Sequence, residues 1–299
     1  MPFHQALPNL INQIQAFPGL QQAPAAPPTM GRRRAVLCGI TYKGHPKSLP
    51  GSINDVICMK NFLINKLGFP NSSVILLTDD EMDRSRIPTK MNIRRALHWL
   101  VQGCQPGDSL VFHYSGHGSK LRDSDGDEVD GHDESLCPVD YETEGRMLDD
   151  EINEIIVRPL PRGATLHAII DTCFSGTFLD LRYLCRINKA GNFMWEDHRV
   201  RHRYKGSKGG TAISISACDD HQTSGDTTAF SGKSNGALTY SFIKTLGTMP
   251  KMTYGQLLIT MRKEIYGTRV AVAGPNAVIQ EPQISATSRF DIHTKNITI

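Results

Sequence analysis

Residues 165–177 have the sequence Thr-Leu-His-Ala-Ile-Ile-Asp-Thr-Cys-Phe-Ser-Gly-Thr, in which an apolar run ends at Asp171 and is followed by Cys173 and Gly176. A short apolar run bounded by turn-forming residues is typical of a buried strand in a parallel sheet. Residues just past the carboxyl end of such a strand lie on a loop at the mouth of a crevice. The stretch therefore predicts an α/β fold that presents Cys173 at one edge of its sheet.

A second run of the same form leads to His117. Residues 108–118 read Asp-Ser-Leu-Val-Phe-His-Tyr-Ser-Gly-His-Gly, another apolar strand that ends in glycines. If the two strands are parallel neighbours, Cys173 and His117 emerge at the same edge, where the imidazole can take the thiol proton and return it to a leaving group. An isolated cysteine after a strand is more often a small buried hydrophobe. Two strand ends that each offer half of a dyad favour a nucleophile and its base.

The rest of the chain alternates strand and helix patterns. Residues 89–101, for example, carry Ile93, Leu97 and Leu100 at helical spacing. The other expected elements are strands over 34–40, 73–78, 211–218, 283–285 and 290–292, helices over 236–246 and 253–266, and a helix capped by Asn54 or Asp55 that ends near Gly68. Alternation of this kind predicts a parallel sheet covered by helices on both faces.

Bulk composition argues against several classes of protein. The 299 residues carry a formal net charge of only +3, with basic residues dispersed among acidic ones, so nothing favours a nucleic-acid partner. Seven cysteines without a CxxC pair favour reduced thiols in the cytoplasm or the nucleus. No segment approaches the roughly 18 apolar residues that span a bilayer, and the amino terminus lacks a signal-peptide pattern. We therefore expect a soluble protein without a membrane partner.

Two segments are expected to lie outside the packed core. Residues 1–31 are rich in Gln, Pro and Ala, a composition typical of a flexible leader. Residues 186–210 are basic and poor in apolar pattern, which indicates an exposed connector.

The motifs at the two strand ends resemble those of the metacaspases, within the caspase and haemoglobinase type of cysteine peptidases. They are Tyr-Ser-Gly-His-Gly at 114–118 and Asp-Thr-Cys-Phe-Ser-Gly at 171–176, and the likeness, to plant type I members, covers roughly residues 32–295. The resemblance implies a caspase-like three-layer sandwich with a mixed, mostly parallel central sheet flanked by helices. It also implies that a larger region, 32–185, and a smaller region, 211–299, pack in the same sheet of a monomer.

The expected reaction is hydrolysis of a peptide bond in a protein substrate. Cys173 attacks the carbonyl as a thiolate, a thioester forms, and His117 protonates the departing amine and then activates water. The backbone N–H groups of Gly118 and Cys173 are expected to hold the oxyanion, because glycine permits a close approach.

Specificity is expected to follow from charge. Asp171 lies two residues before the nucleophile, and the resemblance adds Asp55 and Ser115 to the pocket for the side chain that precedes the cut. Two carboxylates in a partly dry pocket favour Arg or Lys and disfavour acidic side chains. A peptidase of this preference is expected to cleave its own connector, and the resemblance implies a role in programmed cell death or stress responses. A capping role for Asp55 stays open.

An acidic stretch after the His117 strand points to calcium. It nearly matches an EF-hand loop, whose ligand positions one, three, five and twelve would fall on Asp123, Asp125, Asp127 and Glu134. Glu128 stands where that loop requires glycine, and the preceding element is a strand, so a true EF-hand is not expected. The resemblance points instead to four carboxylates, Asp133, Asp149, Asp150 and Asp180. Oxygen ligands suit Ca²⁺, which would act there as a switch that orders the loops beside Cys173. Without the resemblance, Asp149 reads as a helix cap and the others as solvated charge.

Several residues depart from the family pattern. Phe174 stands where many metacaspases have His directly after the nucleophile, and Ser52 stands where many have Cys. No Cys precedes Cys38, so we expect no zinc finger of the kind that many plant relatives carry. Cys218 is expected to be a packed strand-end residue. These departures leave open a catalytically weak scaffold or regulator of other proteases. A cysteine hydrolase for small amides or esters and a calcium-binding module without catalysis are further alternatives.

Overall fold

The computed structural model describes most of the chain. The described residues are 31–122, 131–172, 178–188, 191–198, 206–217, 226–227, 235–249, 251–273 and 281–299. Residues 1–30 of the expected leader and Cys173, the predicted nucleophile, lie outside these ranges.

A mixed sheet of eight described strands forms the centre of the molecule. Its order is β2 (Val74–Thr78), β1 (Arg33–Gly39), β3 (Ser109–Ser115), β7 (Thr165–Asp171), β10 (Thr211–Ser216), β13 (Gln283–Ala286), β8 (Tyr183–Ile187) and β9 (Phe193–Asp197). Neighbouring strands from β2 to β10 are parallel, and those from β10 to β9 are antiparallel. The predicted mixed, mostly parallel sheet is confirmed.

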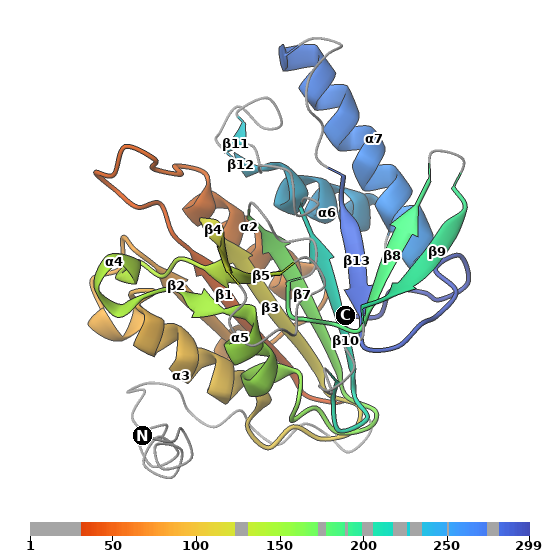
Figure 1. The fold of residues 1–299 in the computed structure, drawn as a ribbon, viewed down its shortest axis with the longest axis horizontal. Coiled ribbons are helices and arrows are strands. Elements are labelled where there is room, and N and C mark those ends of the chain that lie inside the picture. The colour runs from red at the N-terminus through yellow and green to blue at the C-terminus, as the bar shows by residue number, and fades with distance from the viewer. Residues whose placement is uncertain are drawn as a thin grey trace.

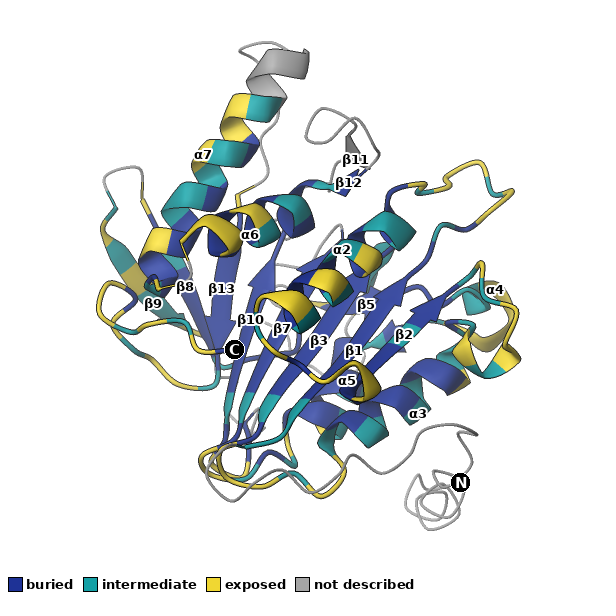
Figure 2. Ribbon diagram, turned by 180° about the vertical axis from the view of Figure 1, so that it is seen from behind, coloured by how far each residue is buried: buried dark blue, intermediate teal, exposed yellow. Residues whose placement is uncertain are grey.

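Helices cover both faces of this sheet. Figure 1 shows α3 (Lys90–Val101) and α5 (Asp149–Ile156) in front of it, and Figure 2 shows α2 (Ser52–Asn65), α6 (Ala237–Thr248) and α7 (Tyr254–Ala273) on the opposite face. Each face buries its own apolar core, because the strands between the helix layers are apolar on both sides. The predicted three-layer α/β sandwich is therefore confirmed. None of the helices in the described part of the chain is long and apolar enough to cross a bilayer.

Short elements complete the fold. They are two 3₁₀ turns (Asn71–Ser73 and Arg84–Arg86), α4 (Tyr141–Glu144), the small sheet of β4 (Gly118–Arg122), β5 (His132–Leu136) and β6 (Met147–Leu148), and the pair β11 (Asp226–Thr227) and β12 (Asn235–Gly236). β4 begins directly after His117, so the small sheet extends from the edge where β3 ends.

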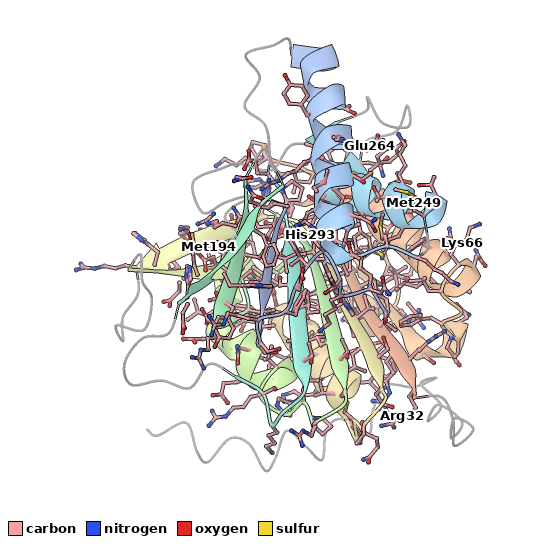
Figure 3. The ribbon with its side chains drawn as sticks, turned by 90° about the vertical axis from the view of Figure 1, so that its right-hand side faces the viewer. Arg32, Lys66, Met194, Met249, Glu264 and His293 are labelled. Atoms are coloured by element: carbon pink, nitrogen blue, oxygen red, sulfur yellow. The ribbon has the colours of Figure 1, made fainter. Side chains whose placement is uncertain are left out.

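Two expectations from the sequence differ from the structure. Residues 290–292 are not a strand, and the sheet is completed instead by the hairpin of β8 and β9. β9 lies within the segment that was expected to be an exposed connector. Its side chains Phe193 and Trp195 pack against the core, whereas Met194 between them, labelled in Figure 3, is 62% exposed. This alternation with a period of two is typical of an edge strand with one buried face. Residues 199–205 of the connector lie outside the described ranges.

Candidate active site

The two strand ends that carry the proposed dyad are neighbours. β3 and β7 pair in parallel, with Ser115 opposite Asp171, so the chain leaves both strands at the same edge of the sheet. The described chain reaches the buried Thr172, one residue before Cys173. Cys173 and Phe174 lie outside the described residues, so the pairing of Cys173 with His117 stays a prediction that this strand order supports.

His117 is half-buried at this edge and is oriented by the loop after β1. Its Nε2 lies 2.6 Å from the carbonyl oxygen of Lys47. Because a carbonyl oxygen only accepts hydrogen bonds, Nε2 carries the proton, and Nδ1 is the ring nitrogen that can act as a base. Burial lowers the pKa of His117, and the nearby His45 and Lys47 lower it further against the opposing effect of the Lys47 carbonyl. The ring is thus neutral at pH 7, as a general base requires.

Tyr42 fixes the backbone of His117, a role that sequence reasoning missed. The Tyr42 hydroxyl accepts a 3.0 Å hydrogen bond from the His117 N–H and donates a 2.6 Å bond to the carbonyl of Cys137. The Tyr114 hydroxyl lies 3.1 Å from that of Tyr42, and the Tyr42 and His117 ring centroids are 4.6 Å apart. Tyr42 has a positive φ of 51°, and Asp79 holds this turn by accepting from the Tyr42 N–H. The sequence offers one signal only, the position of Tyr42 just past a central strand.

Asp55 lies at the same edge, almost fully buried in the first turn of α2. Its carboxylate accepts 2.8 Å from the Ser115 hydroxyl, 3.0 Å from the Asn235 side chain and 2.9 Å from the Gly236 N–H. Burial, followed by repulsion from Asp171, raises the pKa of Asp55 to about 8. The predicted capping role of Asp55 is wrong, because Gly51 is the N-cap of α2 and Asp55 lies inside the first turn of that helix.

Asp171 completes a pair of buried carboxyl groups. Its Oδ2 accepts 2.8 Å hydrogen bonds from both the N–H and the hydroxyl of Thr239 in α6. Gly236 separates the two carboxyl groups, since a Cβ at this position would lie 2.2 Å from Asp171 Oδ2 and 2.8 Å from Asp55 Oδ2. The structure therefore brings the three predicted pocket residues together, with Ser115 bonded to Asp55. Asn235, Gly236 and Thr239 were not predicted from the sequence.

Gly118 and Ser52 are two further residues that the sequence analysis singled out. Gly118 begins β4, where it pairs with Leu136, and its role in holding an oxyanion stays a prediction. Ser52, the first residue of α2, is buried. Cys218 lies outside the described residues.

The four predicted calcium ligands lie on α5 or on segments that contact it. Asp149 and Asp150 open that helix, Asp133 lies on β5, against which α5 packs, and Asp180 follows Leu179, whose carbonyl accepts a 2.6 Å bond from Asn153 of α5. Asp133, Asp149 and Asp180 are buried, and Asp150 is half-buried. All are carboxylates, which fit a hard cation such as Ca²⁺. Among the described residues, however, no three His, Cys, Asp or Glu side chains stand at metal-binding spacing.

The stretch that nearly matches an EF-hand lies between strands. Asp123, Asp125, Asp127 and Glu128 are outside the described residues, and Glu134 lies on β5 with an oxygen 3.5 Å from the Lys120 ammonium of β4. An EF-hand loop joins two helices, so β4 and β5 on either side exclude that motif.

Comparison with known proteins gives matches along the whole chain. Residues 33–182 match the family model described as metacaspase, peptidase C14 domain. The chain is 50% identical to Metacaspase-1 of Arabidopsis thaliana over 319 aligned residues, which cover 100% of this chain and 86% of that protein. It is also 50% identical to Metacaspase-3 of the same plant, over 91% of this chain and 77% of that one. The crystal structure of protein GSU0716 from Geobacter sulfurreducens, 19% identical, has the same fold with a TM-score of 0.58, covering 87% of this chain and 95% of that one.

Proposed function

The chain belongs to the metacaspases, which are cysteine-type endopeptidases of the caspase-like fold, and from this membership we propose that it cleaves proteins after Arg or Lys through Cys173 and His117. The observation that carries the specificity is the pair of buried carboxyl groups, Asp55 and Asp171, at the edge of the sheet beside His117. As a metacaspase, the chain is a hydrolase that acts on proteins.

The hydrolysis proceeds in two steps. His117 takes the thiol proton of Cys173, whose sulfur attacks the carbonyl carbon of the substrate, while the backbone N–H groups of Gly118 and Cys173 stabilise the oxyanion. His117 then returns the proton to the departing amine, and the thioester is hydrolysed by water that the same imidazole activates. The neutral state and the fixed tautomer of His117 support this role.

The carboxyl pair supports a basic side chain before the cut. Two buried carboxylates side by side repel one another, as the raised pKa of Asp55 reflects. A guanidinium or ammonium group relieves that repulsion and donates charge-assisted hydrogen bonds to the carboxylates. An acidic side chain would add a further negative charge beside these carboxyl groups, so cleavage after Asp is not expected.

We extend the proposal to calcium and self-processing. Asp133, Asp149, Asp150 and Asp180 would hold Ca²⁺, whose binding would supply the charge that lets these carboxylates approach one another and order the adjoining loop that carries Cys173. Self-cleavage would fall within residues 186–210, whose basic composition suits the proposed pocket. We further propose that the protein is a monomer in the cytoplasm or the nucleus and that it acts in programmed cell death or stress responses.

The first test uses fluorogenic peptides ending in Arg, Lys or Asp. We expect wild-type protein to cleave the Arg and Lys peptides with millimolar calcium, and Cys173→Ala to cleave none. Cleavage after Asp, or no cleavage by folded wild type, would contradict the proposal; the second result would favour a scaffold role.

Calcium is tested separately from activity. In Cys173→Ala protein, calcium should raise the melting temperature, and adding Asp180→Ala should abolish that shift. Glu144→Ala, at an exposed acid of α4, is the matched control and should keep it. A shift that survives Asp180→Ala would remove Asp180 from the calcium site.

A further inference from the structure

The groups that hold the two pocket carboxylates come from the start of α6, far away in the sequence. Asn235 and Gly236 bind Asp55, which is 180 residues earlier, and Thr239 binds Asp171, which is 68 residues earlier. α6 lies on the same face of the sheet as α2, which carries Asp55 (Figure 2). The geometry of the pocket therefore depends on where α6 begins.

Thr239 makes an unusual contact with Asp171. It is the third residue of α6 and is fully buried. Its N–H and its hydroxyl both donate to the same oxygen, Oδ2 of Asp171, at 2.8 Å each. Two donors on one oxygen restrict rotation of the carboxylate about its terminal bond. The start of the helix also favours a negative charge at this point, because the Thr239 N–H in its first turn is directed toward the carboxylate.

Arginine and lysine make different demands on such a carboxylate. A guanidinium is planar and rigid, and it gains most from a carboxylate whose two oxygens lie in matching orientation. An ammonium is a compact charge on a flexible stem, and it tolerates a rotated carboxylate. Orientation of the pocket carboxylate thus matters more for Arg than for Lys.

We propose that Thr239 is a positioning residue that orients Asp171 so that the pocket prefers Arg over Lys. The inference rests on the proposed cleavage after basic residues and adds the origin of discrimination between them. Thr239 acts through Asp171 and does not itself take part in bond cleavage.

The test compares kcat and KM for two peptides that differ only in Arg or Lys before the cut. Thr239→Val keeps the shape and the backbone N–H but removes the hydroxyl. Given the usual strength of a hydrogen bond to a charged group, kcat/KM should fall about 10-fold for the Arg peptide, mainly through a higher KM, and about 3-fold or less for the Lys peptide. Thr239→Ser keeps the hydroxyl and should retain the wild-type ratio. Thr245→Val is the matched control, since this buried threonine of α6 has a hydroxyl without a partner among the described residues.

The ratio of the two kcat/KM values does not depend on the fraction of active enzyme, so partial misfolding of a variant cannot mimic the effect. If wild type cleaves both peptides and Thr239→Val keeps the wild-type ratio, the inference is wrong while the proposed function stands. An equal change of the ratio in Thr245→Val would also overturn it. If wild type cleaves neither peptide in calcium, the proposed function itself fails.

Discussion

Replacing Gly236 with Ala should weaken cleavage of basic substrates strongly, although it adds a single methyl group. Gly236 has φ −69° and ψ 138°, values that alanine adopts without strain. The added Cβ would instead meet Asp171 Oδ2 at 2.2 Å and Asp55 Oδ2 at 2.8 Å. The substitution therefore acts on the two carboxyl groups and not on the backbone.

The size of the effect follows from these contacts. Carbon and oxygen atoms without a covalent bond approach to about 3.3 Å, so the Asp171 carboxylate must retreat by about 1 Å. Such a displacement breaks its pair of 2.8 Å bonds with Thr239 or moves α6. Overpacking of a buried site costs about 1–3 kcal/mol of stability. If the displaced carboxylate loses the same energy of interaction with the substrate, kcat/KM for Arg peptides falls by about 5- to 150-fold.

The assay measures kcat and KM with an Arg peptide, and melting temperature alongside. Gly247→Ala is the matched control, because Gly247 lies in the same helix and a Cβ there meets no atom within 4 Å. It should leave KM unchanged and stabilise the protein by up to about 1 kcal/mol through helix propensity. A Gly236→Ala enzyme with wild-type KM would refute the reasoning, as would an equal loss in Gly247→Ala.

Three further outcomes are expected. Burial raises the pKa of Asp55 to about 8, so this carboxyl group becomes negatively charged as the pH rises toward 8. The affinity for the guanidinium compound agmatine, measured by calorimetry, should therefore increase by up to about 10-fold per pH unit until pH 8. An affinity that does not change with pH would contradict this. Tyr42→Phe removes the acceptor of the His117 N–H. It should lower kcat about 10-fold with little change in KM, because displacement of a catalytic base slows the chemical step. An unchanged kcat would show that Tyr42 does not position His117. Burial lowers the pKa of His113 and His167 to about 4, so below pH 6.5 the unfolded state binds more protons than the folded state. As the pH falls from 6.5 to 4, each histidine should lower the free energy of unfolding by up to about 3 kcal/mol. Asp55 acts with the opposite sign between about pH 4 and 8. Between pH 6.5 and 4 the two histidines outweigh this one carboxyl group, so urea midpoints that rise as the pH falls from 6.5 to 4 would contradict the net effect.

The strands that present the candidate site could be predicted because their signal is local. Residues 109–115 and 165–171 are mostly apolar runs that are followed by polar residues and glycine, a pattern typical of buried parallel strands. Helix α3 could also be predicted, because Ile93, Leu97 and Leu100 repeat at helical spacing. In the structure Thr89 caps this helix by accepting a hydrogen bond from the Asn92 N–H.

The contacts that shape the pocket have no local signal. The sequence around Asp55 suggests a helix cap, whereas in the structure its carboxylate accepts hydrogen bonds from Ser115, Asn235 and Gly236, which are all distant in the sequence. Helix α5 begins with three acidic residues; the sequence alone predicts a helix cap at Asp149, and the assignment of Asp149 and Asp150 to calcium came from the family resemblance. β9 was missed because its five residues include Glu196 and Asp197, and its buried face depends on packing of Trp195 against Phe290.

The most direct test of the proposed peptidase labels the nucleophile with a peptidyl-Arg chloromethyl ketone. After incubation in calcium, intact mass and peptide mapping report how many labels are bound and on which residue. We expect one label on Cys173, and much slower labelling in His117→Ala, because the thiolate is the reactive form and His117 generates it. Labelling of a half-exposed cysteine such as Cys58 or Cys104 in place of Cys173, or no labelling of folded protein, would contradict the account.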